Sequence, residues 1–217
     1  MAALQLVQKH LADSAAVKLQ LADSAAALVI VEAARQLAEC IAGGGKIMLC
    51  GNGGSAADSQ HIAAEFTSRL RASMERPGIP ALALTTDTSF LTARANDHGF
   101  NDFCQRDVFE RLVDTLGRSG DALVGISTSG TSRNVIRAVA RAREKGILTI
   151  GLLGGTGGAL SRLVDLAVLV PGSSVQHIQE SHIAIGHILC ELVEETLYGS
   201  LKPAHPAETA VTGVLER

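Results

Sequence analysis

Five short apolar segments, separated by helical stretches, constrain the fold of this 217-residue chain most strongly. They are KIMLCG (46–51), PALALT (80–85), DALVGIS (121–127), ILTIGLL (147–153) and VDLAVLV (164–170). Near-continuous apolar runs of this length are typical of strands that are buried on both faces of a parallel sheet. Helical patterns lie between and after them, at 55–70, 88–95, 101–117, 132–145 and 175–198. The alternation predicts a doubly wound α/β domain with three αβα layers.

The two ends of the chain have a different character. Residues 3–42 are rich in Ala and Leu, with apolar spacing near 3.6 and no Pro or Gly, which predicts one long helix or two ending at the GGG of 43–45. Residues 199–217 contain two prolines and no clear periodicity, as expected of a peripheral extension. We therefore predict an N-terminal helical segment at 1–42, an α/β domain at 43–198 and an extension at 199–217.

Composition and charge argue against nucleic-acid and membrane partners. The net charge is -3 and the isoelectric point is near 6.2, so there is no bulk attraction to polyanions. Aromatic residues make up only 3% of the chain and tryptophan is absent, which disfavours stacking on bases. No apolar run approaches the roughly 20 residues of a membrane span, and residues 1–20 do not resemble a signal peptide. Four widely spaced cysteines predict buried free thiols in a reducing cytoplasm.

Two loops rich in glycine and hydroxyl groups follow predicted strands. The first is CGNGGSAAD (50–58), and the second, STSGTSRN (127–134), has five hydroxyl residues around Gly130. Glycine lets backbone N–H groups approach a ligand, and a helix N-terminus favours negative charge. The pattern predicts a phosphate-binding site, although such loops also occur as plain helix caps and turns. The spacing Gly51-x-Gly53-x-x-Ala56 also resembles a dinucleotide fingerprint, but no acidic residue follows where the ribose would need one, which disfavours nicotinamide.

Histidine and carboxylate residues recur on two predicted helices. His61 and Glu65 are spaced i, i+4, so they share a helix face, and such a pair can chelate a metal, act as an acid/base couple or form an ordinary surface contact. The segment HIQESHIAIGH (177–187) places Gln179 and His187 in an otherwise apolar helix. We interpret His182 as a packing or interface residue. His177, at the helix start, either contacts a substrate or only satisfies local hydrogen bonds.

Four stretches together resemble the bacterial phosphoheptose (sedoheptulose 7-phosphate) isomerase family, which has the sugar isomerase (SIS) fold. They are KIMLCGNGGSAADSQHIAAEFTSRL, TTDTSFLTARANDHGFND, GDALVGISTSGTSRNVIRAVARAREKG and IQESHIAIGHILCELVE. The resemblance covers roughly residues 40–198 in the same order and spacing. It implies a five-stranded parallel sheet preceded by one or two N-terminal helices, and a homotetramer with active sites at subunit interfaces. The segment 1–42 would then serve oligomerisation.

The resemblance also implies roles for individual residues. Glu65 and His187 would be the catalytic base and acid. His61, Glu65, Gln179 and His187 would bind one zinc ion per subunit. The substrate-binding positions would be Asn52, Gly53, Gly54, Ser55, Glu65, Arg69, Asn96, Asp97, Ser127, Thr128, Ser129, Ser132 and Gln179. The sequence departs from the family at Gln176 and His177, where Asp or another polar residue and then Arg or Lys are common, so the resemblance does not define the sugar contacts at these two positions.

The reaction that the resemblance implies is isomerisation of sedoheptulose 7-phosphate to D-glycero-D-manno-heptose 7-phosphate through an enediol(ate). This is the first step of activated-heptose biosynthesis. Two alternatives remain: an isomerase of a different sugar phosphate, and a non-catalytic SIS protein that senses a sugar phosphate or binds the replication initiator. Glu65 and His187, together with His61 and Gln179, favour catalysis.

Overall fold

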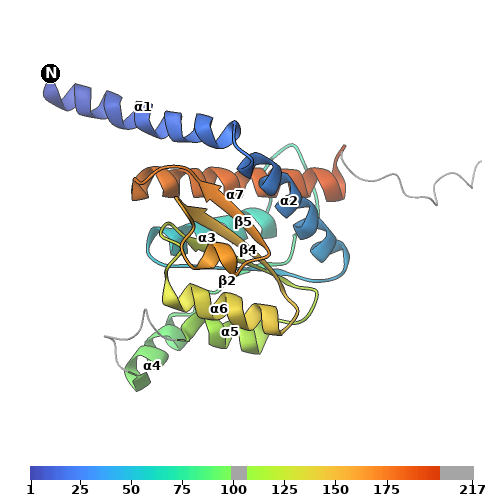
Figure 1. Ribbon diagram of the computed structural model, residues 1–217. Coiled ribbons are helices and arrows are strands. Elements are labelled where there is room, and N and C mark those ends of the chain that lie inside the picture. Colours follow the sequence, from blue (N-terminus) through green and yellow to red (C-terminus); the bar gives the residue numbers. More distant parts are fainter. Residues whose placement is uncertain (99–106, 201–217) are drawn as a thin grey trace, which may run out of the picture.

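The computed structural model describes residues 1–98 and 107–200 and contains a five-stranded sheet with the order β2-β1-β3-β4-β5 (Figure 1). All neighbouring strands are parallel. The strands are β1 (Ile47–Gly51), β2 (Ala81–Ala83), β3 (Ala122–Ser127), β4 (Leu148–Gly154) and β5 (Leu166–Val170). The predicted doubly wound parallel sheet is confirmed. β2 is shorter than predicted, since it lies at the edge of the sheet and pairs with β1 alone.

Helices cover both faces of this sheet. They are α1 (Ala2–Ala22), α2 (Ala26–Ala42), α3 (Gly54–Thr67), α4 (Thr88–His98), α5 (Val108–Leu116), α6 (Arg133–Glu144) and α7 (Val175–Tyr198), with a 3₁₀ turn η2 (Leu160–Arg162). The predicted helix 101–117 is observed from Val108 onward, and 101–106 lie outside the described residues, as do 201–217 of the extension.

Two aliphatic cores hold the layers together. Leu37, Ile62 and Ile185 belong to the core between the sheet and helices α2, α3 and α7. Val113 and Val139 belong to the core between the sheet and helices α5 and α6. Each fully buried Leu, Ile or Val contributes about 1.5–3 kcal/mol of transfer free energy. The three-layer arrangement therefore follows from the apolar runs that the sequence places in the strands and on one side of each helix (Figure 1).

The N-terminal segment forms two helices, the second of the two alternatives. The chain bends by 71° between α1 and α2, and the Ser24 hydroxyl bridges the break, donating to the Leu21 carbonyl at 2.8 Å and accepting from the Ala26 N–H at 3.2 Å. α1 projects away from the layered body (Figure 1). Among the described helices none is by itself long and apolar enough to cross a membrane, although α1 and α2 taken as a bent pair reach that length and composition.

The strand order fixes where a ligand can enter. From β1 the chain moves to the edge strand β2 and then returns to β3 on the other side of β1. The connections from β1 and β3 therefore leave the sheet in opposite directions, and in such folds the crevice at their carboxyl ends holds the ligand. Residues 52–54 and 127–132, which carry the two predicted anion-binding loops, follow these strands.

Candidate active site

The first loop is tied to the second by a pair of reciprocal hydrogen bonds. The Asn52 amide donates to Asn134 Oδ1 at 3.0 Å, and the Asn134 amide donates to Asn52 Oδ1 at 2.8 Å. Asn134 is buried in the first turn of α6. Gly53 has φ +56°, a backbone conformation that suits glycine. The two loops are thus held side by side at the switch point, as the strand order requires.

The second loop holds its hydroxyl groups in a compact arrangement. Ser127 Oγ lies 3.0 Å from Ser132 Oγ and accepts the Gly130 N–H at 3.1 Å, while Ser129 Oγ lies 2.9 Å from Thr131 Oγ1. Ser132 is the N-cap residue of α6, but its side chain makes no capping hydrogen bond and lies beside Ser127 Oγ instead.

Gly130 explains why this loop is narrow. Its φ is +65°, and an added Cβ would lie 1.9 Å from the Gly157 carbonyl oxygen, so only glycine fits against that neighbouring loop. Thr128 is half-buried beside it. The loop therefore presents several hydroxyl groups within one short turn at the start of α6, an arrangement that can bind an anion without a cationic side chain.

Helices α3 and α7 bring together side chains that are 126 residues apart in the sequence. His61 Nε2 lies 2.8 Å from His187 Nε2, and the two rings form an edge-to-face pair. Glu65 Oε1 lies 3.6 Å from His61 Nε2. Gly186 permits this contact, since a Cβ there would lie 2.4 Å from Ile62 Cδ1. Two imidazoles and a carboxylate thus meet on the facing sides of the two helices.

Gln179 joins the same contact through a residue that the sequence analysis missed. Its amide nitrogen donates to both carboxylate oxygens of Asp58, at 3.1 and 3.2 Å, and it packs directly over Gly54. Burial raises the pKa of Asp58, and the hydrogen bond from Gln179 and the charge of His61 partly offset this effect. The amide oxygen lies over Gly54 and accepts no hydrogen bond from Asp58, which is an acceptor itself. The i, i+3, i+7 spacing of 58, 61 and 65 was the available signal.

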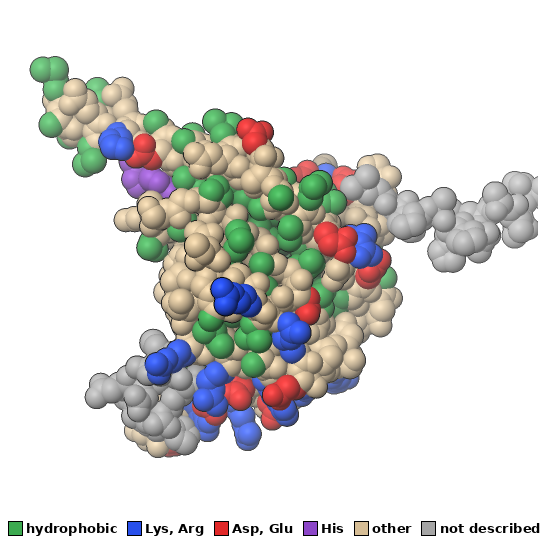
Figure 2. All heavy atoms as spheres, viewed as in Figure 1, with side chains coloured by type: hydrophobic (Ala, Val, Ile, Leu, Met, Phe, Trp, Pro, Cys, Tyr) green, Lys and Arg blue, Asp and Glu red, His purple; other side chains and the backbone are tan. Residues whose placement is uncertain are grey.

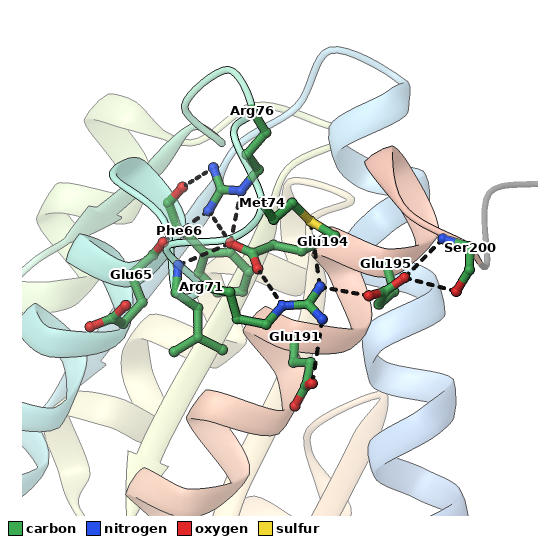
Figure 3. A network of polar contacts seen from close by, with 10 residues as sticks. Glu65, Phe66, Arg71, Met74, Arg76, Glu191, Glu194, Glu195 and Ser200 are labelled. Atoms are coloured by element: carbon green, nitrogen blue, oxygen red, sulfur yellow. Dashed lines mark hydrogen bonds and ion pairs between the residues drawn. The ribbon is translucent and has the colours of Figure 1, made fainter.

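A buried ion pair braces α3 against α7 beyond the histidines (Figure 3). Arg76 and Glu194 are joined at 2.8 Å and both side chains are fully buried. The same guanidinium donates to the backbone carbonyls of Glu65 and Phe66, each at 2.9 Å. Glu194 also accepts the Leu70 N–H at 3.0 Å. The backbone that carries Glu65 is therefore attached, through Arg76, to the helix that carries His187.

Four of the predicted substrate-binding residues make no contact with the His61–His187 pair in the described part of the chain. Ser55 is buried in the first turn of α3. Arg69 is exposed and pairs with Glu75. Asn96 and Asp97 are exposed on α4, and no hydrogen bond or ion pair within residues 1–98 and 107–200 joins them to the other predicted site residues. Their roles remain predictions.

Comparisons with known proteins match this chain to one family in both sequence and fold. Residues 10–154 match the family model described as the SIS domain. The chain is 54% identical over 170 residues to a phosphoheptose isomerase of Chlorobaculum tepidum, which covers 78% of this chain and 79% of that relative. It is also similar to two solved structures of phosphoheptose isomerases. The one from Neisseria gonorrhoeae has a TM-score of 0.78 and 42% identity, covering 88% of this chain and 98% of that one. The one from Francisella tularensis has a TM-score of 0.82 and 35% identity, covering 90% and 100%.

Proposed function

We propose that this chain, which belongs to the phosphoheptose isomerase family of SIS-domain proteins, isomerises sedoheptulose 7-phosphate to D-glycero-D-manno-heptose 7-phosphate. This is an intramolecular aldose–ketose isomerisation and would be the first step of activated-heptose biosynthesis. The observation that carries the proposal is the contact of His61 with His187 at 2.8 Å, with the Glu65 carboxylate 3.6 Å from His61. A sensor or an adaptor has no need of such a group on the helix that begins at an anion-binding loop.

The reaction moves one proton between C1 and C2 and another between O1 and O2 through an enediol(ate) intermediate. It needs a base at the carbon and an acid at the oxygen, each within hydrogen-bond reach of its proton. Glu65 is the base in this proposal, since an ionised carboxylate accepts a proton, and His187 is the acid. Their positions on two facing helices allow them to approach the two reacting groups of one bound sugar from different sides.

The phosphate is remote from the reacting carbons and anchors the sugar. Ser127, Thr128, Ser129 and Ser132 are the hydroxyl donors of this proposal, and Asn52, Gly53 and Gly54 border them at the switch point. Binding energy from a non-reacting group can hold the reacting carbons in position. Arg69, Asn96 and Asp97 are exposed, so in this proposal they contact the sugar in an active site shared between protomers.

His61, Glu65, Gln179 and His187 are the residues that would hold a zinc ion in this proposal. The two imidazole nitrogens face each other, and the Glu65 carboxylate contacts His61 but not His187, so the Glu65 and Gln179 side chains would have to turn toward the imidazoles for all four to bind one ion. Two nitrogen and two oxygen donors form a set that suits zinc. When bound there, zinc would polarise the substrate carbonyl or fix these four side chains relative to one another.

The assembly in this proposal is a cytoplasmic homotetramer. Large apolar side chains are exposed along the two N-terminal helices, among them Leu4, Leu11, Leu28 and Val31 (Figure 2). An apolar cavity of about 370 Å³ lies between α1, α2 and α7. Exposed apolar surface of this kind is typical of a protein interface. The free thiols of Cys50 and Cys190 are buried, in keeping with a reducing compartment.

The test is a coupled assay of the purified chain with sedoheptulose 7-phosphate, fructose 6-phosphate and ribulose 5-phosphate. We expect turnover of the first and at least 100-fold lower kcat/KM for the other two. Preference for one of the shorter sugars would replace the heptose assignment with another isomerase. Binding of all three without turnover would support a sensor instead.

A further inference from the structure

Helices α1 and α7 meet in a second cluster of metal-ligating side chains. One ligand atom each from His10, His177 and Glu180 lies within 4.8 Å of the other two. His10 Nε2 is 3.3 Å from Glu180 Oε1, and His177 Nε2 is 3.4 Å from His10 Nδ1. The histidine rings pack edge to face with centroids 4.6 Å apart. This cluster shares no residue with the His61–His187 contact.

We infer that His10, His177 and Glu180 form a second zinc site, which fastens α1 to the start of α7. Two imidazoles and a carboxylate, with water in the fourth position, are a common zinc donor set. With bonds of about 2.0–2.1 Å, neighbouring ligand atoms of a tetrahedral zinc lie about 3.3 Å apart. The separation of His10 Nε2 from Glu180 Oε1 has this value, whereas His177 Nε2 lies nearest to His10 Nδ1, so a small rotation of the His177 side chain would bring the third ligand to the same ion.

Neighbouring groups already orient the ligands. Ser14 donates a hydrogen bond to Glu180 Oε2, which directs the other oxygen toward His10. Lys18 donates to the Ser14 hydroxyl at 2.6 Å and lies 3.7 Å from Glu180 Oε2. Hydrogen bonds from outside the ligand set commonly fix such side chains and strengthen metal binding. The positive charge of Lys18 opposes a cation, so we expect weaker binding than at a site with four protein ligands.

Exposure gives the ion access to the cluster. His177 is buried against α1, whereas His10 and Glu180 keep 49% and 39% of their side-chain surface open to solvent. Figure 2 shows histidine side chains at the surface in the angle below α1. The N-terminal half of α1 projects beyond the layered body (Figure 1), so a metal at His10 would hold the helix close to where it leaves its support.

The experiment measures zinc bound to the full-length chain after dialysis against buffered micromolar free zinc. Four variants are compared with the parent chain: His10→Ala, His61→Ala, the double variant, and Gln8→Ala as an exposed control on α1. We expect two zinc ions per parent chain, one for each single histidine variant, none for the double variant and two for Gln8→Ala. Equal zinc content in the parent and in His10→Ala would overturn the inference.

The two zinc assignments can fail independently. If His61 binds no zinc, the parent chain and His61→Ala both bind one ion, and His10→Ala binds none. Amide exchange gives a second readout in the His61→Ala background. There zinc should slow exchange in α1 at least 10-fold, and adding His10→Ala should remove the effect. Exchange in α1 that does not respond to zinc would contradict the fastening of this helix.

Discussion

Helix α7 makes two polar contacts of opposite character, one with α3 and one with α1. The contact with α3 joins His187 to His61, and two turns further along α7 Glu194 pairs with Arg76, which follows α3 and donates to the α3 carbonyls of Glu65 and Phe66. The contact with α1 joins His177 and Glu180 to His10. The first is backed by a fully buried ion pair, and the second is open to solvent on two of its three side chains.

The difference lies in what each contact can tolerate. A buried charge that loses its partner is not hydrated, so separating Arg76 from Glu194 is costly in free energy. This ion pair therefore keeps α3 and α7 in one relative position. An exposed hydrogen-bonded group exchanges protein for water at little cost, so α1 can shift without leaving a polar group buried and unpaired. The residues proposed for proton transfer therefore lie on the rigid contact, where reacting groups need fixed geometry.

The largest expected effect comes from removing the proposed acid or base. Glu65→Gln and His187→Gln should each lower kcat by a factor of about 10² to 10⁴, the usual contribution of general acid–base catalysis. His10→Ala should retain kcat within about twofold, because it lies on the other contact. Steady-state kinetics with circular dichroism as a fold control provides the measurement. Comparable losses from His10→Ala would remove the distinction between the two contacts.

The second largest effect is on the stability of the fold and comes from the buried ion pair of Arg76 and Glu194. Arg76→Ala should lower the free energy of unfolding by about 3–5 kcal/mol, since it leaves the Glu194 carboxylate buried without its partner. Arg71→Ala is a matched control, because Arg71 also contacts Glu194, at 3.5 Å, but is 29% exposed. That variant should cost about 1 kcal/mol, because Glu194 keeps Arg76 as its fully buried partner and the remaining pairs of Arg71 are partly exposed. Urea denaturation of both variants tests this contrast, and equal losses would argue against burial as its cause.

The loop at 127–132, with its cluster of hydroxyl groups, lies outside both contacts. Substitutions there test substrate binding separately from proton transfer. Ser127→Ala combined with Ser132→Ala removes two hydroxyl donors from the proposed phosphate site, and each hydrogen bond to a charged group is worth about 1.5–3 kcal/mol. Phosphate binding acts in the ground and transition states alike, so KM should rise at least 10-fold with little change in kcat. A loss confined to kcat would place these hydroxyls at the reacting atoms.

His182 lies on α7 between the two contacts and is fully buried. Burial lowers its pKa from 6.5 to about 4, with a partly compensating interaction with the Leu153 backbone. As the pH falls, His182 is therefore protonated near pH 6.5 in the unfolded chain but only near pH 4 in the folded chain. Stability from this group is complete above pH 6.5 and is lost as the pH falls, by about 2 kcal/mol between pH 7.5 and 5. Urea denaturation of His182→Asn at both pH values should show a correspondingly smaller difference.

The fold was predictable from local patterns, except where tertiary contacts decide. The apolar runs located both ends of every strand to within two residues, because strands that are buried on both faces require such runs. The break between α1 and α2 was left open. The hexapeptide LADSAA lies inside α1 at 11–16 and spans the break at 21–26, so identical local sequence forms two structures. Leu21 and Ala26 of the second copy pack in the apolar core with α2 and α7, whereas no residue of 11–16 belongs to that core, and this packing provides the difference.

The site was predictable in part. Helical spacing placed His61 and Glu65 on one face, but their meeting with His187 depends on Gly186 packing against Ile62, a contact that no local pattern contains. The family resemblance supplied that link. Asp58 was missed because its value lies in the hydrogen bonds to Gln179 from another helix. His10 was given no role, since its partners on α7 are about 170 residues away in the sequence.

The smallest expected effect is that of His10→Ala in the metal-free chain. Without zinc the α1 contact consists of hydrogen bonds and ion pairs that are largely exposed, and such interactions contribute about 0–1 kcal/mol. Urea denaturation in the presence of a chelator should therefore show a loss below 1 kcal/mol, close to that of Gln8→Ala. With zinc added, the parent chain should gain stability over His10→Ala, because the ion binds only the folded arrangement of α1 and α7. A loss of 3 kcal/mol or more without zinc would mean that the α1 contact is as rigid as the α3 contact, and the contrast between the two sides of α7 would fail.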